Sequence, residues 1–151
     1  MDQPDLTTVP VLQEELLLVT AAKHALARHR KISARDLASE PFVLFESGSN
    51  TRRAIDDFFV SARINPPIVM ETENVEIIKA LVRNGIGISI IPYQSVARDV
   101  TSGHLFCARI EGSSLVRETG WVHARMTRTP RAVQEVIRAF GRVRPKLRLA
   151  P

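Results

Sequence analysis

The chain has 151 residues, of which 44% are hydrophobic and 25% charged, and its net charge is +5. This composition is typical of a folded globular protein and excludes a mainly disordered chain. No apolar run approaches the roughly 20 residues needed to cross a bilayer, so we expect no membrane contact. The single cysteine, Cys107, excludes a disulfide framework, and the N-terminus is acidic and polar, unlike a signal peptide. We therefore expect a cytoplasmic protein.

The charge is unevenly distributed along the chain. Residues 1–116 sum to −2, whereas residues 117–151 sum to +7. A basic segment can contact nucleic acid, or it can form a solvated helix face. Because no aromatic residues are interleaved with the basic ones, we interpret this segment as a solvated helix face.

The first half of the chain alternates between predicted strands and helices. Residues 16–19 predict a strand, and a polar loop with one helical turn follows. Ser33 and Asp36 have capping-box spacing and open a short helix. The apolar run at 42–45 predicts a strand buried on both faces. A helix at about 51–62 comes next, and its predicted apolar face comprises Ala54, Ile55, Phe58, Phe59 and Ala62.

The alternation continues beyond the prolines at 66–67, which end that helix. We expect a strand at 68–70, a helix from Asn74 to the glycine at position 85, and a strand at 86–91. The later pattern is weaker, with strands at 105–110 and 119–123 and a helix at 130–143. Strand–helix alternation over 42–91 predicts an α/β fold with a parallel-dominated sheet.

A polar turn, Ser47-Gly48-Ser49-Asn50-Thr51, joins the strand at 42–45 to the following helix. The unpaired N–H groups of a helix N-terminus attract anions, and these hydroxyl and amide side chains add donors. Gly48 lets a ligand approach the backbone closely. The alternative is that Ser49 or Asn50 only caps the helix while the others turn the chain.

A second polar junction, Thr72-Glu73-Asn74, follows the strand at 68–70. In a parallel sheet both junctions lie at the carboxyl edge, where ligands of open α/β sheets bind. Asn74 has the simpler interpretation of a helix cap. Glu73 either faces solvent or favours a ligand that carries an amine or hydroxyl group.

Other candidate residues have competing explanations. Gly87 inside a strand indicates close approach of a ligand or of another backbone, and we favour packing. Trp121 is best interpreted as a buried wall. The four histidines show no metal-ligand spacing, and no nucleophile elbow or phosphate-binding loop is present, so we expect no metal, no cofactor and no catalytic residue.

Several stretches together resemble the effector-binding domain of LysR-type transcriptional regulators. These are EELLLVTAAKHALA, ISARDLASEPFVLFESGSNTRRAIDDFF, ETENVEIIKALVRNGIGISIIP and TPRAVQEVIRAF, in the family's order and spacing. The resemblance runs from about residue 11 to residue 143. It implies a type 2 periplasmic-binding-protein-like fold, with a Rossmann-like lobe and part of a second lobe.

The resemblance also implies how the chain is divided. Residues 1–20 would be a residual segment of the first lobe with a crossing strand. Residues 21–117 would be the complete second lobe, and residues 118–151 the return strand and C-terminal helix of the first. The family's helix-turn-helix domain and the first half of its effector domain have no counterpart here, so DNA contact would require a domain outside this chain.

The resemblance implies a sensing function, in which a small anionic organic effector binds between the lobes of a homodimeric regulator and controls transcription. Ligand-binding residues would be Ser47, Gly48, Ser49, Asn50, Thr51, Thr72, Glu73, Asn74 and Gly87, with Thr20 and Trp121 as cleft wall. A solute-binding protein fragment and a dehydratase-like enzyme on the same fold are the alternatives. Effector identity, the sign of regulation and the target genes do not follow from the sequence.

Overall fold

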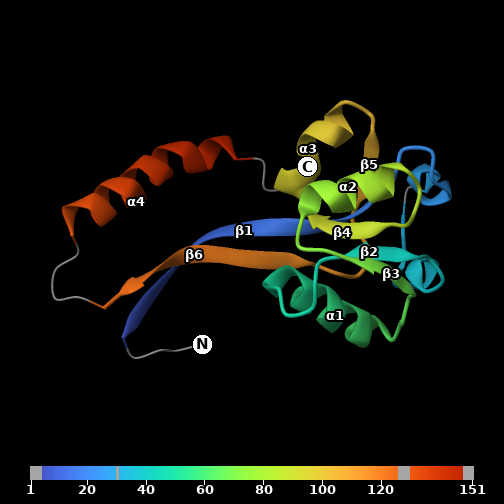
Figure 1. Cartoon of the computed structure of the whole chain (residues 1–151), viewed down its shortest axis with the longest axis horizontal. Coiled ribbons are helices and arrows are strands. Elements are labelled where there is room, and N and C mark those ends of the chain that lie inside the picture. The colour runs from blue at the N-terminus through green and yellow to red at the C-terminus, as the bar shows by residue number, and fades with distance from the viewer. Residues whose placement is uncertain (1–4, 30, 126–129, 148–151) are drawn as a thin grey trace.

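The computed structural model describes residues 5–29, 31–125 and 130–147. Figure 1 shows three parts: a lobe of helices packed around a sheet, a two-stranded ribbon that extends away from the lobe, and a helix that lies along the ribbon. The lobe contains the predicted α/β alternation. The ribbon and the last helix come from the two ends of the chain.

The sheet of the lobe has one reversed strand among strands of common direction. Strand β2 (Phe42–Leu44) pairs in parallel with β3 (Ile68–Glu71). A parallel bridge between Phe42 and Ile88 connects β2 to the segment entering β4 (Ser89–Pro92). Strand β1 (Leu6–Ala21) is antiparallel to β4 and to β5 (Leu105–Ala108). The predicted parallel-dominated arrangement is therefore present, with β1 inserted between β4 and β5.

Two apolar cores lie on the two faces of this sheet, because alternate strand residues point in opposite directions. Helix α1 (Asn50–Ala62) packs on one face, over Phe42 and Leu44. Helices α2 (Val75–Arg83) and α3 (Tyr93–Thr101) cover the other face, which includes Val43. All three residues of β2 are completely buried, which confirms the prediction of a strand buried on both faces.

The helix ends follow the predicted local signals. Ser49 caps α1, its Oγ accepting a hydrogen bond from the Arg52 backbone N–H at 3.1 Å. Asn74 caps α2, its Oδ1 accepting from the Glu76 backbone N–H at 2.9 Å. Gly85 has φ +75° after α2, as expected for a glycine that ends a helix.

The ribbon consists of residues 6–15 of β1 paired with β6 (Val116–Ala124). Helix α4 (Arg131–Val143) contacts it through an edge-to-face pair of Trp121 and Phe140, with ring centroids 5.3 Å apart. α4 contains no buried residue, although its apolar residues recur on one side. Several apolar side chains of the ribbon and α4 are accordingly exposed, namely Val9, Val116, Val122, Val136 and Val143.

The structure differs from the sequence-based expectation in two elements. Helix α3 was not predicted, although Val96 and Val100 have helical spacing behind Pro92 at the helix N-cap. Strand β1 is far longer than the predicted 16–19, and it continues into the ribbon past a register shift near Pro10. Residues 16–21 of β1 pair with β4 and β5 in the lobe sheet, whereas residues 6–15 pair with β6.

Candidate functional site

The two polar junctions lie side by side at the carboxyl edge of the sheet. We call residues 45–51 the first corner and residues 72–74 the second corner. Leu44 pairs with Glu71 in the parallel ladder, and the Thr72 backbone N–H donates to the Leu44 carbonyl at 3.1 Å. The two corners are therefore at the same edge, as the parallel sheet predicts.

The side chain of Arg52 fills the space between these corners. Its Nη1 donates to the Phe45 carbonyl at 2.9 Å and to Glu71 Oε1 at 2.7 Å, and its Nε donates to Asp56 Oδ1 at 2.8 Å. Only 9% of this side chain is exposed. Burial acts to lower the pKa of Arg52, but the hydrogen bonds to Asp56 and Glu71 outweigh it and raise that pKa. The Arg52 guanidinium therefore links the two corners through contacts made by the chain's own side chains.

The first corner remains polar and largely accessible. Ser47, Gly48 and Asn50 are exposed, and Gly48 has φ +94°. Ser49 is committed to capping α1, which is the simpler of its two interpretations. Thr51 differs from its neighbours because it is only 5% exposed. At the first corner the N-terminus of α1 is therefore exposed and is surrounded by polar side chains.

The second corner is explained mainly by helix capping. The Asn74 backbone N–H donates to Thr72 Oγ1 at 3.3 Å, and Asn74 itself caps α2. Glu73 is exposed. This geometry agrees with the interpretation of Asn74 as a helix cap. The Glu73 side chain makes no hydrogen bond or ion pair with the residues that the structure describes.

Arg117 of the ribbon faces the first corner and was missed in the sequence analysis. Its Nη1 donates to Thr51 Oγ1 at 2.9 Å, and its Nε and Nη2 each lie 2.7 Å from Glu14 Oε2. Glu14 and Arg117 are direct cross-strand partners between β1 and β6. A cation therefore stands over the start of α1. No local signal marks it, because the strand register brings the two residues together.

Thr20 is misplaced in the sequence-based site. It is completely buried and pairs with Phe106 of β5. Leu16, not Thr20, pairs with Pro92 at the carboxyl end of β4, and Thr20 lies further along β1 toward the amino edge of the parallel strands. Thr20 cannot form a wall of a site at the two corners.

Gly87 also lies at the amino edge, away from the corners. A Cβ added there would come within 2.6 Å of the Pro41 carbonyl oxygen. The Ile88 backbone N–H donates to that same oxygen at 2.8 Å. Close packing against the neighbouring strand therefore explains this glycine, and we remove it from the site.

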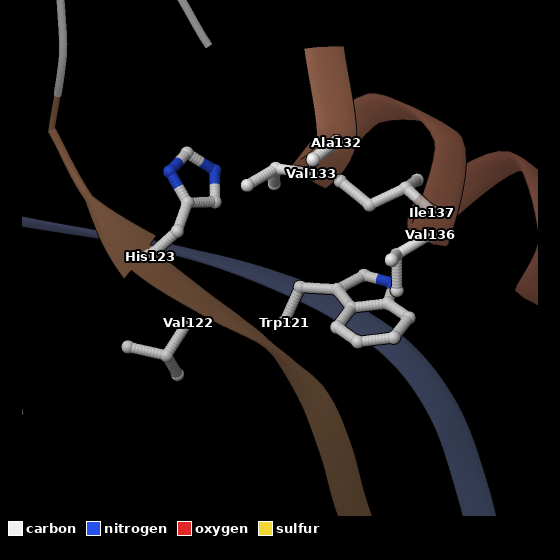
Figure 2. Close-up of a pocket in the computed structure, with 7 residues that line it drawn as sticks. All are labelled: Trp121, Val122, His123, Ala132, Val133, Val136 and Ile137. Atoms are coloured by element: carbon white, nitrogen blue, oxygen red, sulfur yellow. The ribbon is translucent and has the colours of Figure 1, made fainter. Parts of the chain in front are cut away.

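Trp121 belongs to the ribbon–α4 contact and not to the corners. Figure 2 shows its indole directed toward Val136 and Ile137 of α4. These residues line a cavity of about 230 Å³ between β6 and α4. Trp121 is four residues beyond Arg117 on β6, a distance of about 13 Å along a strand. Trp121 therefore lies against α4 and does not form the expected cleft wall at the two corners.

The described residues show no group of three or more His, Cys, Asp or Glu side chains that could hold a metal ion. The part of the chain described by the structure also has no helix whose length and apolar character would suit a bilayer span.

Comparison with known proteins gives the family. A family model described as the LysR substrate binding domain matches residues 2–144. The transcriptional activator CmpR of Synechocystis sp. is 36% identical over 104 residues, which are 69% of this chain and 34% of CmpR. The regulator CbbR of Xanthobacter flavus is 37% identical over 111 residues, which are 72% of this chain and 33% of CbbR. The chain spans about a third of the length of these curated relatives.

Solved structures show the same fold. The effector-binding domain of QuiR in complex with shikimate matches with a TM-score of 0.76 and 26% identity, over 88% of this chain and 62% of that one. The regulatory domain of CcmR from Synechocystis in complex with 2-PG gives a TM-score of 0.79 at 24% identity, over 94% and 70%. These neighbours confirm the predicted type 2 periplasmic-binding-protein-like fold.

CmpR and CbbR are named as transcriptional regulators. The family model, the curated relatives and the solved domains agree on one assignment. The chain belongs to the LysR substrate-binding domain family.

Proposed function

We propose that this chain is an effector-sensing part of a LysR-type transcriptional regulator and that it binds a small anionic organic molecule at the first corner. The observation that carries the proposal is the exposed, polar start of α1, which faces the ribbon at the carboxyl edge of the sheet. QuiR and CcmR domains of this fold hold shikimate and 2-PG, which supports a small-molecule effector.

The chemistry of the first corner favours an anion. Backbone N–H groups in the first turn of a helix lack intrahelical acceptors, and the helix dipole makes this end partially positive. Ser47 and Asn50 are exposed polar side chains at this end, and Gly48 leaves the approach to the backbone open, since a Cβ there would meet nothing within 4 Å. Ser49 and Thr51 complete the proposed set, and Thr72, Glu73 and Asn74 border it.

We further propose that the ribbon and α4 are parts of a first lobe and that the effector lies between this lobe and the α/β lobe. A two-stranded ribbon is marginal by itself, and α4 buries no residue, so both have apolar surface available for further protein contacts. A homodimer is the proposed assembly. DNA would be contacted through the helix-turn-helix domain after which the relatives are named, and we propose a cytoplasmic location for such a regulator.

Calorimetric titration of the 151-residue chain with a panel of small organic anions, including shikimate and 2-PG, tests the proposal. We expect saturable binding that weakens in the variant Asn50→Asp. A carboxylate at the helix start repels an anionic ligand while it interacts favourably with the helix dipole, so the fold is retained.

Asn65→Asp is the matched control, because Asn65 is also exposed but lies beyond the opposite end of α1. Equal loss of affinity in both variants would indicate a general charge effect and not a site at the first corner. Absence of saturable binding to every anion in the panel would overturn the proposed function.

A further inference from the structure

Arg117 is placed to do more than hold the ribbon together. It reaches from β6 to α1, where Nη1 donates to the Thr51 hydroxyl, while Nε and Nη2 contact Glu14. Glu14 is 7% exposed and Thr51 5%, yet a third of the Arg117 side chain is accessible to solvent. The guanidinium is thus anchored by two buried residues, while a third of the whole Arg117 side chain is exposed to solvent.

Among the residues that the structure describes, the hydrogen bonds of this cluster leave N–H and O–H donors without acceptors. Glu14 and Thr51 occupy three donor contacts of Arg117, and a guanidinium has further N–H groups on both Nη atoms. Arginine cannot accept a hydrogen bond, so the Thr51 oxygen is the acceptor in their contact. The hydroxyl hydrogen of Thr51 has no acceptor among the residues that the structure describes. Unused donors from the ribbon and from α1 therefore meet at one point.

We propose that Arg117 binds the anionic group of the effector and selects for a negative charge, with the Thr51 hydroxyl as a second donor to the same group. This inference rests on the proposed function and names the residue that the ribbon contributes to it. Planar guanidinium groups pair well with carboxylate and phosphate oxygens. Glu14 holds the guanidinium over α1 and compensates its charge when no anion is bound.

A nearby arginine provides the matched control. Arg109 forms the same kind of pair with Glu15, the residue next to Glu14, with Nη2 and Oε2 2.8 Å apart. Successive residues of a strand point to opposite faces, so this pair lies on the other side of β1. In its described contacts Arg109 does not reach α1.

The experiment measures the dissociation constants of shikimate, its methyl ester and 2-PG by calorimetry in Arg117→Gln, Arg117→Lys and Arg109→Gln. A charge-assisted contact predicts that Arg117→Gln binds the anions about ten- to hundredfold more weakly. We expect an intermediate loss in Arg117→Lys, little change in Arg109→Gln, and little effect of Arg117→Gln on the uncharged ester.

Arg117→Gln leaves the Glu14 carboxylate buried without its partner, which can prevent folding. The double variant Glu14→Gln/Arg117→Gln removes both charges and serves as the second test, and its melting curve shows whether it folds. Loss of anion affinity in this folded double variant supports the proposal.

Two different results would overturn the proposed role of Arg117, and they have different consequences for the proposed function. If the wild-type chain binds the anions and the Arg117 variants bind them equally well, or lose acid and ester alike, the proposed function stands and the role of Arg117 is wrong. If the wild-type chain binds no anion, both proposals are wrong.

Discussion

Arg52 and Glu71 join the two corners through an ion pair in which Nη1 and Oε1 are 2.7 Å apart. The arginine comes from the first turn of α1 and the glutamate from the last residue of β3. Because Arg52 also bonds the Phe45 carbonyl and Asp56, it fixes the start of α1 against the edge of the sheet. The shape of the proposed site therefore depends on a residue that need not touch the effector.

We predict that Arg52→Ala lowers the free energy of unfolding by about 1–3 kcal/mol, since it removes a side chain that is 9% exposed and leaves the Phe45 carbonyl without this donor. Denaturant unfolding measures this change. Arg53→Ala is the control, because Arg53 is exposed on the same turn and its contact with the Gly48 carbonyl is long, at 3.5 Å. Similar losses in the two variants would contradict the role given to Arg52.

The second prediction is that alanine substitutions at Gly87 and Gly141 change the stability in opposite directions. Gly87→Ala places a Cβ against the Pro41 carbonyl and should destabilise the lobe by about 1–3 kcal/mol. Gly141→Ala adds a Cβ with nothing within 4 Å, inside α4, and should stabilise by about 0.5–1 kcal/mol through helix propensity. Thermal unfolding of both variants shows whether each substitution raises or lowers the melting temperature. A neutral Gly87→Ala would show that the strands separate more easily than the structure indicates.

Amide hydrogen exchange should distinguish α4 from α1. Helix α1 buries Thr51, Arg52, Ile55, Phe58 and Phe59, whereas α4 buries no residue. Helical hydrogen bonds that are not covered by tertiary packing open at low cost, so we expect faster exchange throughout α4. Mass spectrometry of peptides from both helices measures this within one sample. Equal protection would mean that α4 is covered, for example by a second copy of the chain.

Cys107 should react slowly with alkylating reagents. Burial raises the pKa of its thiol, and nearby Arg109 only partly opposes this effect. A raised pKa reduces the thiolate fraction at neutral pH, and the thiolate is the reactive form. The unfolded thiol ionises at a lower pH, so this group contributes less stability as the pH rises above the unfolded value. Reaction with iodoacetamide in the native and urea-unfolded chain compares the two rates, and equal rates would refute the prediction.

The sequence by itself determined the local elements of the lobe. The apolar run at 42–45, the helix after Ser49, the Asn74 cap and the glycine after α2 are signals contained within a few residues, and the structure confirms them. Parallel strands also determined that the two corners share one edge, because the carboxyl ends of such strands must lie together.

Only the tertiary structure decided what surrounds those corners. The strand register pairs Arg117 with Glu14 and brings it into contact with Thr51. The register of β1 with β5 puts Thr20 at the opposite edge of the sheet from the corners. Trp121 contacts Phe140 of α4. Register depends on pairing between residues that are distant in sequence, and a strand's own residues do not specify its partner. Capping and apolar periodicity act locally and were predictable, whereas the composition of the site depends on these nonlocal pairings.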